Sequence, residues 1–495
     1  MLTTRRPHDR TDVRRLSAWS TAILLAGVLG CRGPGATVSA PGPITLRIGL
    51  GLSVGTRPDI GIQQVARNIA LQGLVGVGRD GRPRPLLAES WSVSHDGLVW
   101  RVRLHAAAFH SGTPANAPLI QRLLQAQLPG ALGPAVEDLA EIRTVSDRDL
   151  EFSLRQRSTF LLEGLDVLLE EPGSTLSGTG AFYVVHQDNR LEMRANDTYY
   201  GGKPAIARVT IEPFTSVRAA WADMLRGNVD MLYDVGVDAL DSIESSKDVK
   251  VFTFQRGYAH MILLNVRKPY LSDPRFRREL NAAIDRGALV RDILAGHGSP
   301  AEGPVWPHHW AYSANLPRFQ YSPHVRDDRS PARRLKCLFV DPSHERLALA
   351  VQRQLQAIGV QLDLEMLPGS QVLSRLQSAD FDAILADFVQ GPNLVRPYLF
   401  WHSGGPFNWG RYADTEVDGA LDAIRHAADD DAYRSGVAAF QRAIVDDPPA
   451  IFLAWRERAR AVSRRFDVAA EPGDDVLTAI HLWRPAASGG MARRN

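Results

Sequence analysis

Apolar and polar residues alternate in many short segments of the chain, and this alternation predicts β-strands. In ITLRIGL (44–50) every second residue is apolar, as in a strand with one buried face. The same alternation lies on both sides of Asp96 and Gly97, a pair that supplies the positive φ angles of a tight hairpin turn. Four more strands are predicted in this half, at 149–155, 181–187, 190–196 and 207–214.

Helical spacing of apolar residues appears between these strands and becomes more regular in the second half. Helices are predicted at 62–74, 115–145 and 216–226. The predicted order of the second half is strand 251–266, helix 274–295, strand 335–340, helix 344–358, strand 360–367, helix 370–377, strand 381–387, helices 414–426 and 431–445, and strand 451–457. Alternating strands and helices indicate an α/β fold, with two lobes and an inserted β-rich subdomain.

The change of pattern along the chain predicts the domain boundaries. At 495 residues, the chain exceeds the ~250–300 residues at which single cores stop growing, so several lobes are expected. The predicted segments are a signal peptide (1–30), a tether (31–43), lobe I (44–75), the inserted subdomain (76–171), the second part of lobe I (172–255), lobe II (256–455), and a return to lobe I with a tail (456–495).

The N-terminal residues are typical of an export signal that ends in a lipidation site. An uncharged segment, Leu16–Gly30, follows five arginines and is too short for a membrane span of ~20 residues. It ends VLGC, which resembles a bacterial lipobox, with Cys31 as the residue that would carry the lipid. The following RGPGATVSAPGP is a flexible tether. Cys337, the other cysteine, is expected to be a buried, inert thiol.

Charge and chemistry argue against several classes of function. Without residues 1–30, which hold five basic and two acidic residues, 52 basic residues face 53 acidic ones, so no general attraction for nucleic acid is expected. Gly51–Gly55 spells G-x-S-x-G around Ser53, but a loop with Pro58 follows where a nucleophile elbow would start a helix. The histidines lack metal-ligand spacing, and phosphate-binding loops are absent. We therefore expect no catalytic residue, no metal and no cofactor: a binding protein rather than an enzyme.

Several segments in order resemble the bacterial extracellular solute-binding family 5, which takes up peptides, nickel and related solutes. The first, within GRPRPLLAESWSVSHDGLVWRVRLHAAAFHSGTP, matches at Pro85, Leu87–Trp91, Asp96–Leu98, Phe109, His110 and Gly112–Pro114. Others are Gly178–Gly180 with Phe182, NDTYYGGKP (196–204), MLRGNVDM (224–231) and the long stretch 263–305. The resemblance implies a two-lobed, type II periplasmic-binding-protein-like α/β fold. It also implies that the lobes close around a solute in a water-excluded cleft.

The resemblance also suggests residues for the ligand site. In the family a carboxylate binds the α-ammonium group of a peptide, and FDAILADFVQGP places Asp387 at that position, although Ile384 replaces the usual tryptophan. Further predicted ligand residues are Tyr258, His260, Trp306, Trp401, Asn408 and Trp409. Aromatic side chains on loops stack on ligands, but they also serve as packing.

The implied function is that of the substrate-binding lipoprotein of an ABC importer, which would pass its solute, a peptide in the first instance, to permease and ATPase subunits. We expect an extracytoplasmic monomer held to a membrane by the lipid on Cys31. Non-peptide solutes (a nickel chelate, a sugar or an opine) remain alternatives. So do a serine hydrolase that uses Ser53 and a lipoprotein that has lost transport and acts as a scaffold or chaperone.

Overall fold

The computed structural model describes residues 42–51, 58–187, 190–324, 333–339 and 341–487. The predicted signal peptide, Cys31 and Ser53 lie outside these residues. The chain divides into Met1–Gly42 and Pro43–Asn495, and the fold below is that of the second unit. In the described residues no helix combines the length and the apolar character that crossing a membrane requires.

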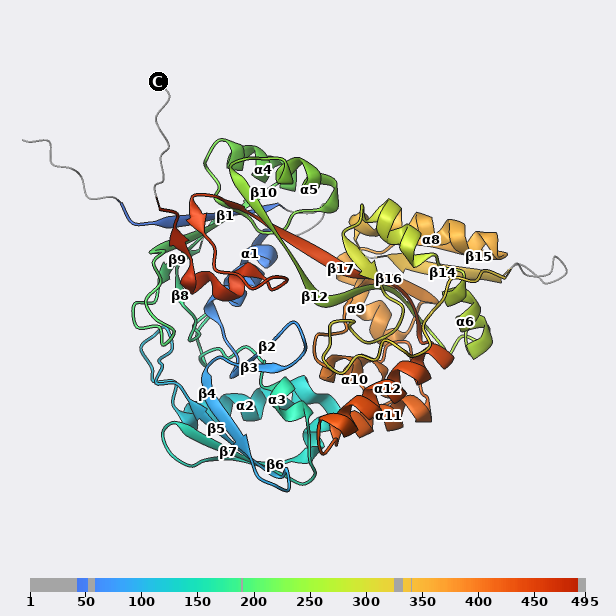
Figure 1. Ribbon diagram of the computed structural model, residues 1–495, viewed down its shortest axis with the longest axis horizontal. Helices are drawn as coiled ribbons and strands as arrows, with labels where there is room; N and C mark the ends of the chain where they lie inside the picture. The colour runs from blue at the N-terminus through green and yellow to red at the C-terminus, as the bar shows by residue number, and fades with distance from the viewer. Residues whose placement is uncertain (1–41, 52–57, 188–189, 325–332, 340, 488–495) are drawn as a thin grey trace, which may run out of the picture. The chain divides into compact units, whose positions relative to one another are not determined.

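A large mixed sheet of eleven strands organises this unit (Figure 1). Along the sheet the strands follow in the order β15 (Val360–Met366), β14 (Arg333–Phe339), β16 (Ala383–Val389), β12 (Val249–Leu264), β17 (Ala450–Ser463), β11 (Met231–Leu232), β1 (Thr45–Gly51), β10 (Arg208–Phe214), β9 (Leu191–Ala195) and β8 (Phe182–Gln187), and β13 (Gly298–Pro300) pairs with β17.

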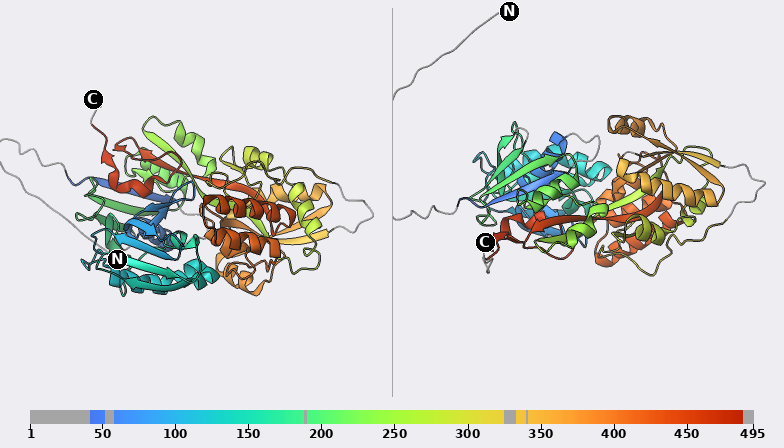
Figure 2. Two further views of the ribbon diagram at one scale, coloured as in Figure 1. Left: turned by 60° about the horizontal axis from the view of Figure 1, so that its bottom comes forward. Right: turned by 90° about the horizontal axis from the view of Figure 1, so that it is seen from above.

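Two long antiparallel strands, β12 and β17, connect the two halves of this sheet. Val249–Gln255 pairs with the C-terminal part of β17, beside β11. After a register shift, Ala259–Leu263 pairs with the N-terminal part of β17, and here β16 lies on the other side of β12. The strands, green and red, lie side by side in Figures 1 and 2. Each predicted lobe therefore contains one end of both strands.

Helices cover both faces of the large sheet, each through its apolar side. The helix α1 (Pro58–Ala70) packs on the half that contains β1, while α4 (Val217–Leu225) and α5 (Val237–Glu244) belong to a separate apolar cluster of the same half. On the other half, α6 (Pro274–Ala282) and α8 (Glu345–Ala357) pack against β14, β16 and β12. Cys337 is fully buried in this last cluster, as expected, and burial raises the pKa of its thiol to about 12.

The inserted region has its own four-stranded antiparallel sheet. Its order is β4 (Ala88–Val93), β5 (Val99–Leu104), β7 (Asp149–Leu154) and β6 (Leu139–Thr144). The helix α2 (Ala117–Leu132) packs on it, and a short ribbon of β2 (Val75–Val77) and β3 (Pro83–Pro85) precedes it. The helices α10 (Val395–Trp401), α11 (Thr415–Arg425) and α12 (Asp430–Asp446) share one apolar cluster with this sheet.

Most of the predicted elements are present, but two predicted helices are too long. The helix predicted over 115–145 ends at Leu132, because Gly133 has a positive φ of 54° and Pro134 cannot continue the hydrogen-bond ladder. A 3₁₀ turn and β6 follow. The helix predicted over 274–295 ends at Ala282, and the Asp285 side chain caps a new short helix, α7 (Arg286–Ala288), followed by a π-helical turn. The predicted domain boundaries stay predictions.

A buried carboxylate joins the inserted region to α10 and α12. Glu163, in α3 (Phe160–Gly164), accepts hydrogen bonds from the backbone N–H groups of Leu394 (2.9 Å) and Val395 (2.8 Å). Its other oxygen accepts a bond from the Tyr433 hydroxyl, 3.1 Å away. Burial disfavours the charged form and raises the pKa of Glu163 to about 7, although these bonds act in the opposite direction.

We expect this carboxyl group to make the fold less stable as the pH rises. Because its folded pKa lies above the ordinary 4.5, the folded state binds more protons than the unfolded state between about pH 4.5 and pH 7. Stability is therefore lost across that window, by about 3 kcal/mol at 1.36 kcal/mol per pKa unit. Denaturant unfolding of Glu163→Gln should lack this loss, whereas the exposed control Glu141→Gln should keep it. Equal pH profiles for wild type and Glu163→Gln would contradict the assignment.

Candidate functional site

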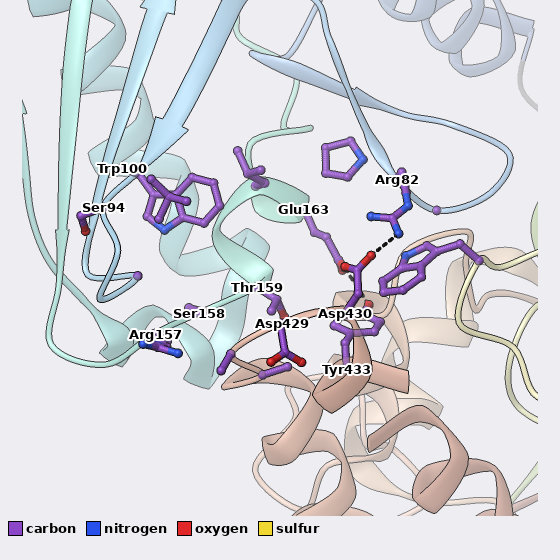
Figure 3. Close-up of a pocket in the computed structure, with 18 of the residues that line it drawn as sticks. Arg82, Ser94, Trp100, Arg157, Ser158, Thr159, Glu163, Asp429, Asp430 and Tyr433 are labelled. Carbon is purple, nitrogen blue, oxygen red and sulfur yellow. Dashed lines mark hydrogen bonds and ion pairs between the residues drawn. The ribbon is translucent and has the colours of Figure 1, made fainter. Parts of the chain in front are cut away.

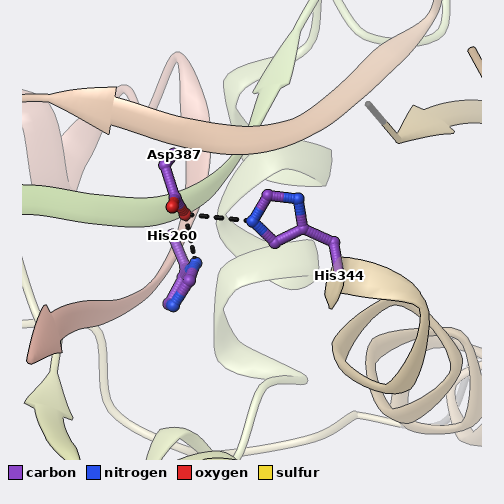
Figure 4. Close-up of side chains that lie close together, drawn as sticks. All are labelled: His260, His344 and Asp387. Carbon is purple, nitrogen blue, oxygen red and sulfur yellow. Dashed lines mark hydrogen bonds and ion pairs between the residues drawn. The ribbon is translucent and has the colours of Figure 1, made fainter. Parts of the chain in front are cut away.

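The carboxylate of Asp387 lies at the centre of a cluster of charged and polar side chains. Asp387 on β16 is directly opposite His260 on the neighbouring β12, so both side chains point to the same face of the sheet. His344, at the start of α8, reaches the same place, and its Nε2 lies 3.1 Å from Asp387 Oδ1. His260 Nδ1 also contacts Oδ1. Both imidazoles therefore meet one carboxylate oxygen (Figure 4).

The second oxygen of Asp387 is bound by an arginine that also lies near another carboxylate. Arg456 on β17 places its Nη1 2.5 Å from Asp387 Oδ2, and its Nη2 is 3.9 Å from Asp234 Oδ2. Arg458, on the same strand, binds Asp234 at 2.6 Å. Two carboxylates thus alternate with two guanidinium groups. They extend the cluster from β16 to the segment after β11, in the half of the sheet that contains β1.

This arrangement keeps both acids charged although little water reaches them. Burial alone would raise the pKa of Asp387, but His260, His344 and Arg456 hold it well below its ordinary value. Burial opposes the charge of Asp234 as well, yet Arg458 and Arg456 lower the pKa of this carboxyl too. Asp387 is therefore an anion at any pH near neutrality. Its charge is compensated by side chains from β12, from β17 and from the start of α8.

A close approach of two backbone segments lies next to the cluster. Gly257 in β12 has a φ of 62°, which favours glycine, and a Cβ atom there would come within 2.4 Å of the Gly391 backbone. The Gln390 N–H group donates to the Gly257 carbonyl oxygen over 2.8 Å. Tyr258, the next residue, points to the same face as His260 and is half-buried. Gly257 thus allows the segment after β16 to lie against the bulge of β12.

Of the seven predicted ligand residues, the structure brings Asp387, His260 and Tyr258 together on one face. Trp306 lies on the other face, because it packs against Trp455, whose neighbour Arg456 points to the cluster. Trp306 is fully buried, and its Nε1–H donates to the Arg79 carbonyl oxygen (3.0 Å).

The other three predicted residues, Trp401 at the end of α10 with Asn408 and Trp409 after it, also lie away from the cluster. Trp401 is buried and donates a hydrogen bond to the Gln390 side chain. Asn408 binds the backbone N–H and C=O groups of Tyr412 and so shapes its own loop. Trp409 packs edge-on against Phe400. All three side chains have internal contacts, and their role in ligand binding stays a prediction.

Two cavities open at other places of the described residues. The first, about 500 Å³, lies between the inserted region and the start of α12 (Figure 3). Trp100, Ser158 and Glu163 line one side of it, and Asp430, which is bound by Arg82, lines the other. The second, about 450 Å³, has the polar lining Arg79, Asp80, Arg84, His308, Glu471, Pro472 and Asp474. None of the seven predicted ligand residues lines either cavity.

Residues 82–410 match the family described as bacterial extracellular solute-binding proteins, family 5. The chain belongs to this family. The protein is therefore a solute-binding protein, and the family resemblance seen in the sequence is confirmed.

Relatives of known name bind peptides, and solved structures have the same fold. The chain is 24% identical to the probable D,D-dipeptide-binding periplasmic protein DdpA of Escherichia coli K12. This alignment spans 416 residues and covers 76% of this chain and 80% of that protein. It is 22% identical over 435 residues to the oligopeptide-binding protein AppA of Bacillus subtilis 168 (77% and 80%). NikZ from Campylobacter jejuni in complex with Ni(L-His) superposes with a TM-score of 0.75 at 20% identity, over 89% of this chain and 99% of that chain. These likenesses confirm the two-lobed, type II fold.

Sequence reasoning identified Asp387 and His260 but missed two partners of the carboxylate, His344 and Arg456. His344 ends a short 3₁₀ turn and directly precedes α8, and nothing in that segment distinguishes it from an ordinary helix-terminal residue. Arg456 lies in RERAR, which resembles the exposed part of an edge strand. The available signal was the alternation along β17, which points Arg456 and Arg458 to one face.

Proposed function

We propose that this protein is the substrate-binding subunit of an ABC importer and that it captures short peptides by closing its two lobes. The names of the relatives DdpA and AppA support a peptide as the solute. A structural neighbour, DppA from Helicobacter pylori, is described as an ABC transporter-associated periplasmic binding protein in complex with the peptide STSA. The observation in this chain that carries the proposal is the partly buried, charged carboxylate of Asp387 at the junction of β12, β16 and β17.

Asp387 binds the α-ammonium group of the peptide in place of Arg456. The Arg456 side chain is more than a third exposed (36%), and its second nitrogen already lies near Asp234. When the ammonium group reaches Oδ2, Arg456 turns to Asp234, so that Asp387 keeps a cation beside it and Arg456 keeps an anion. This exchange avoids the cost of several kcal/mol that an unpaired buried charge carries.

Closure of the lobes takes place at the two long strands. The register shift in β12 between Gln255 and Ala259, next to Gly257, divides the part of the strand beside β11 from the part beside β16. A bulge of this kind bends a strand without breaking its pairing on either side. Because Asp234 and Asp387 lie in different halves, the exchange of Arg456 between them links ligand capture to the position of the lobes.

We further propose that the chain is exported as a lipoprotein and has no catalytic activity. The uncharged segment before VLGC and the flexible sequence after Cys31 support a lipid anchor. In a bacterial host fed with an alkyne-labelled fatty acid, the full-length protein should take up the label and Cys31→Ser should not. Equal labelling of both proteins, or labelling of neither, would refute lipidation at Cys31.

The peptide proposal predicts a ligand-dependent rise in thermal stability that requires Asp387. A short peptide at a hundredfold excess over its Kd should stabilise the folded state by about 2.7 kcal/mol, because only the folded state binds it. Asp387→Asn keeps the side-chain shape but removes the charge, so the same peptides should stabilise it far less. Peptides with an acetylated N-terminus should fail with the wild type, since they have no ammonium group.

The matched control is Asp363→Asn, which changes a partly exposed aspartate of the outer strand β15. This variant should respond to peptides as the wild type does. Nickel chelates, sugars and opines are screened under the same conditions. If one of them stabilises the protein and no peptide does, the peptide proposal is wrong. It is also wrong if peptides stabilise Asp387→Asn as much as the wild type.

A further inference from the structure

We propose that His260, His344 and Asp387 form a binding site for a divalent transition-metal ion of the zinc, nickel or copper class. Their possible ligand atoms all lie within 4.8 Å of one another. Two imidazole nitrogens and a carboxylate oxygen are donors that these ions favour. His260 and His344 are 84 residues apart in the chain, which is why sequence spacing gave no sign of the site.

The donor atoms need only small movements to accept an ion. Donors ~2.0–2.2 Å from a tetrahedral ion lie ~3.3 Å from one another, and His344 Nε2 is 3.1 Å from Asp387 Oδ1. The imidazole rings of His260 and His344 are nearly perpendicular, with an angle of 84° and a centroid distance of 5.5 Å (Figure 4). Rotation of the side chains about their torsions would bring both nitrogens around an ion beside Oδ1.

A second observation concerns the fit between His260 and Asp387. His260 Nδ1 is buried, and its close contact with Asp387 Oδ1 is poorly aligned for a hydrogen bond. The side chain of His260 is only 8% exposed. A cation between this nitrogen and Oδ1 would turn the crowded contact into two coordination bonds.

The surrounding structure holds the donors in place. His260 and Asp387 lie in adjacent inner strands of the large sheet, and His344 is fixed by a turn in which the Asp341 side chain accepts a bond from the Ser343 N–H group (2.8 Å). Arg456 binds only Oδ2 of Asp387 and leaves Oδ1 to the ion. Metal-binding carboxylates are commonly oriented by such a second hydrogen bond.

Three protein ligands leave at least one coordination position open for water or for a donor atom of a bound solute. All three residues belong to the predicted lobe II (256–455), so the ion should bind without closure of the lobes. The site goes beyond the proposed capture of peptides and does not depend on it. Oδ1 serves the metal ion, whereas the exchange of Arg456 for an ammonium group takes place at Oδ2.

The test is calorimetric titration of the chelator-treated, purified protein with Ni²⁺ and Co²⁺, together with the visible spectrum of the Co²⁺ form. One ion per chain is expected to bind, and His260→Ala and His344→Ala should each weaken binding by at least about tenfold. His95→Ala, at an exposed turn, is the matched control and should bind as the wild type. His344→Cys keeps a donor at this position, so it should bind Co²⁺ and add a thiolate charge-transfer band in the near ultraviolet.

The proposal is overturned if the wild type binds no ion in a one-to-one ratio, or if His260→Ala and His344→Ala bind as tightly as the wild type. Unfolding curves of each variant show whether a loss of binding reflects a loss of the fold, and the thiolate band of His344→Cys does not depend on that distinction. Peptide titrations in the presence of a chelator separate the two proposals. Peptide binding without any metal binding refutes the metal site alone, and metal binding without peptide binding refutes only the peptide.

Discussion

The carboxylate of Asp387 remains charged in a place that little water reaches. Neighbouring side chains therefore have to stabilise the anion in place of water. Burial raises the free energy of the anion, so donors and cations have to be supplied by neighbouring segments. His260, His344 and Arg456 supply them from β12, the start of α8 and β17. Since these segments are far apart in the sequence, the pairing of β12 with both β16 and β17 has to form before the charge can be accommodated.

The strands β12 and β17 place the site where the two halves of the sheet are connected. β12 and β17 are the longest strands of the described chain, with 16 and 14 residues, and they pair with each other along both halves of the sheet. β17 also pairs with β11 in one half, and β12 pairs with β16 in the other. Arg456 lies where β17 faces the bulge of β12, between a carboxylate of each half. A guanidinium group with two possible counterions can respond to a ligand that competes for one of them, without leaving a buried charge unpaired.

Local sequence patterns predicted the elements of the fold better than the surroundings of the site. Alternation and the Asp96–Gly97 turn predicted the β4–β5 hairpin, since a hairpin depends on neighbouring residues. The pattern over 115–145 failed at Gly133, where the backbone conformation and Pro134 overrode the apolar spacing.

The site was predictable only in part, because it depends on contacts between segments that are far apart in the sequence. Asp387 followed from a family resemblance, but its partners follow from strand register across long separations, which one sequence does not reveal. Asn408 is a similar case, because one sequence does not reveal that its side chain binds the backbone of Tyr412 within its own turn.

The most direct test of this account is a crystal structure of the protein with a captured peptide. The account predicts that the ammonium nitrogen of the peptide lies within hydrogen-bond distance of Asp387 Oδ2, and that Arg456 has moved to Asp234. A complex in which Arg456 still occupies Asp387, while the peptide binds elsewhere, would contradict the role given to this carboxylate.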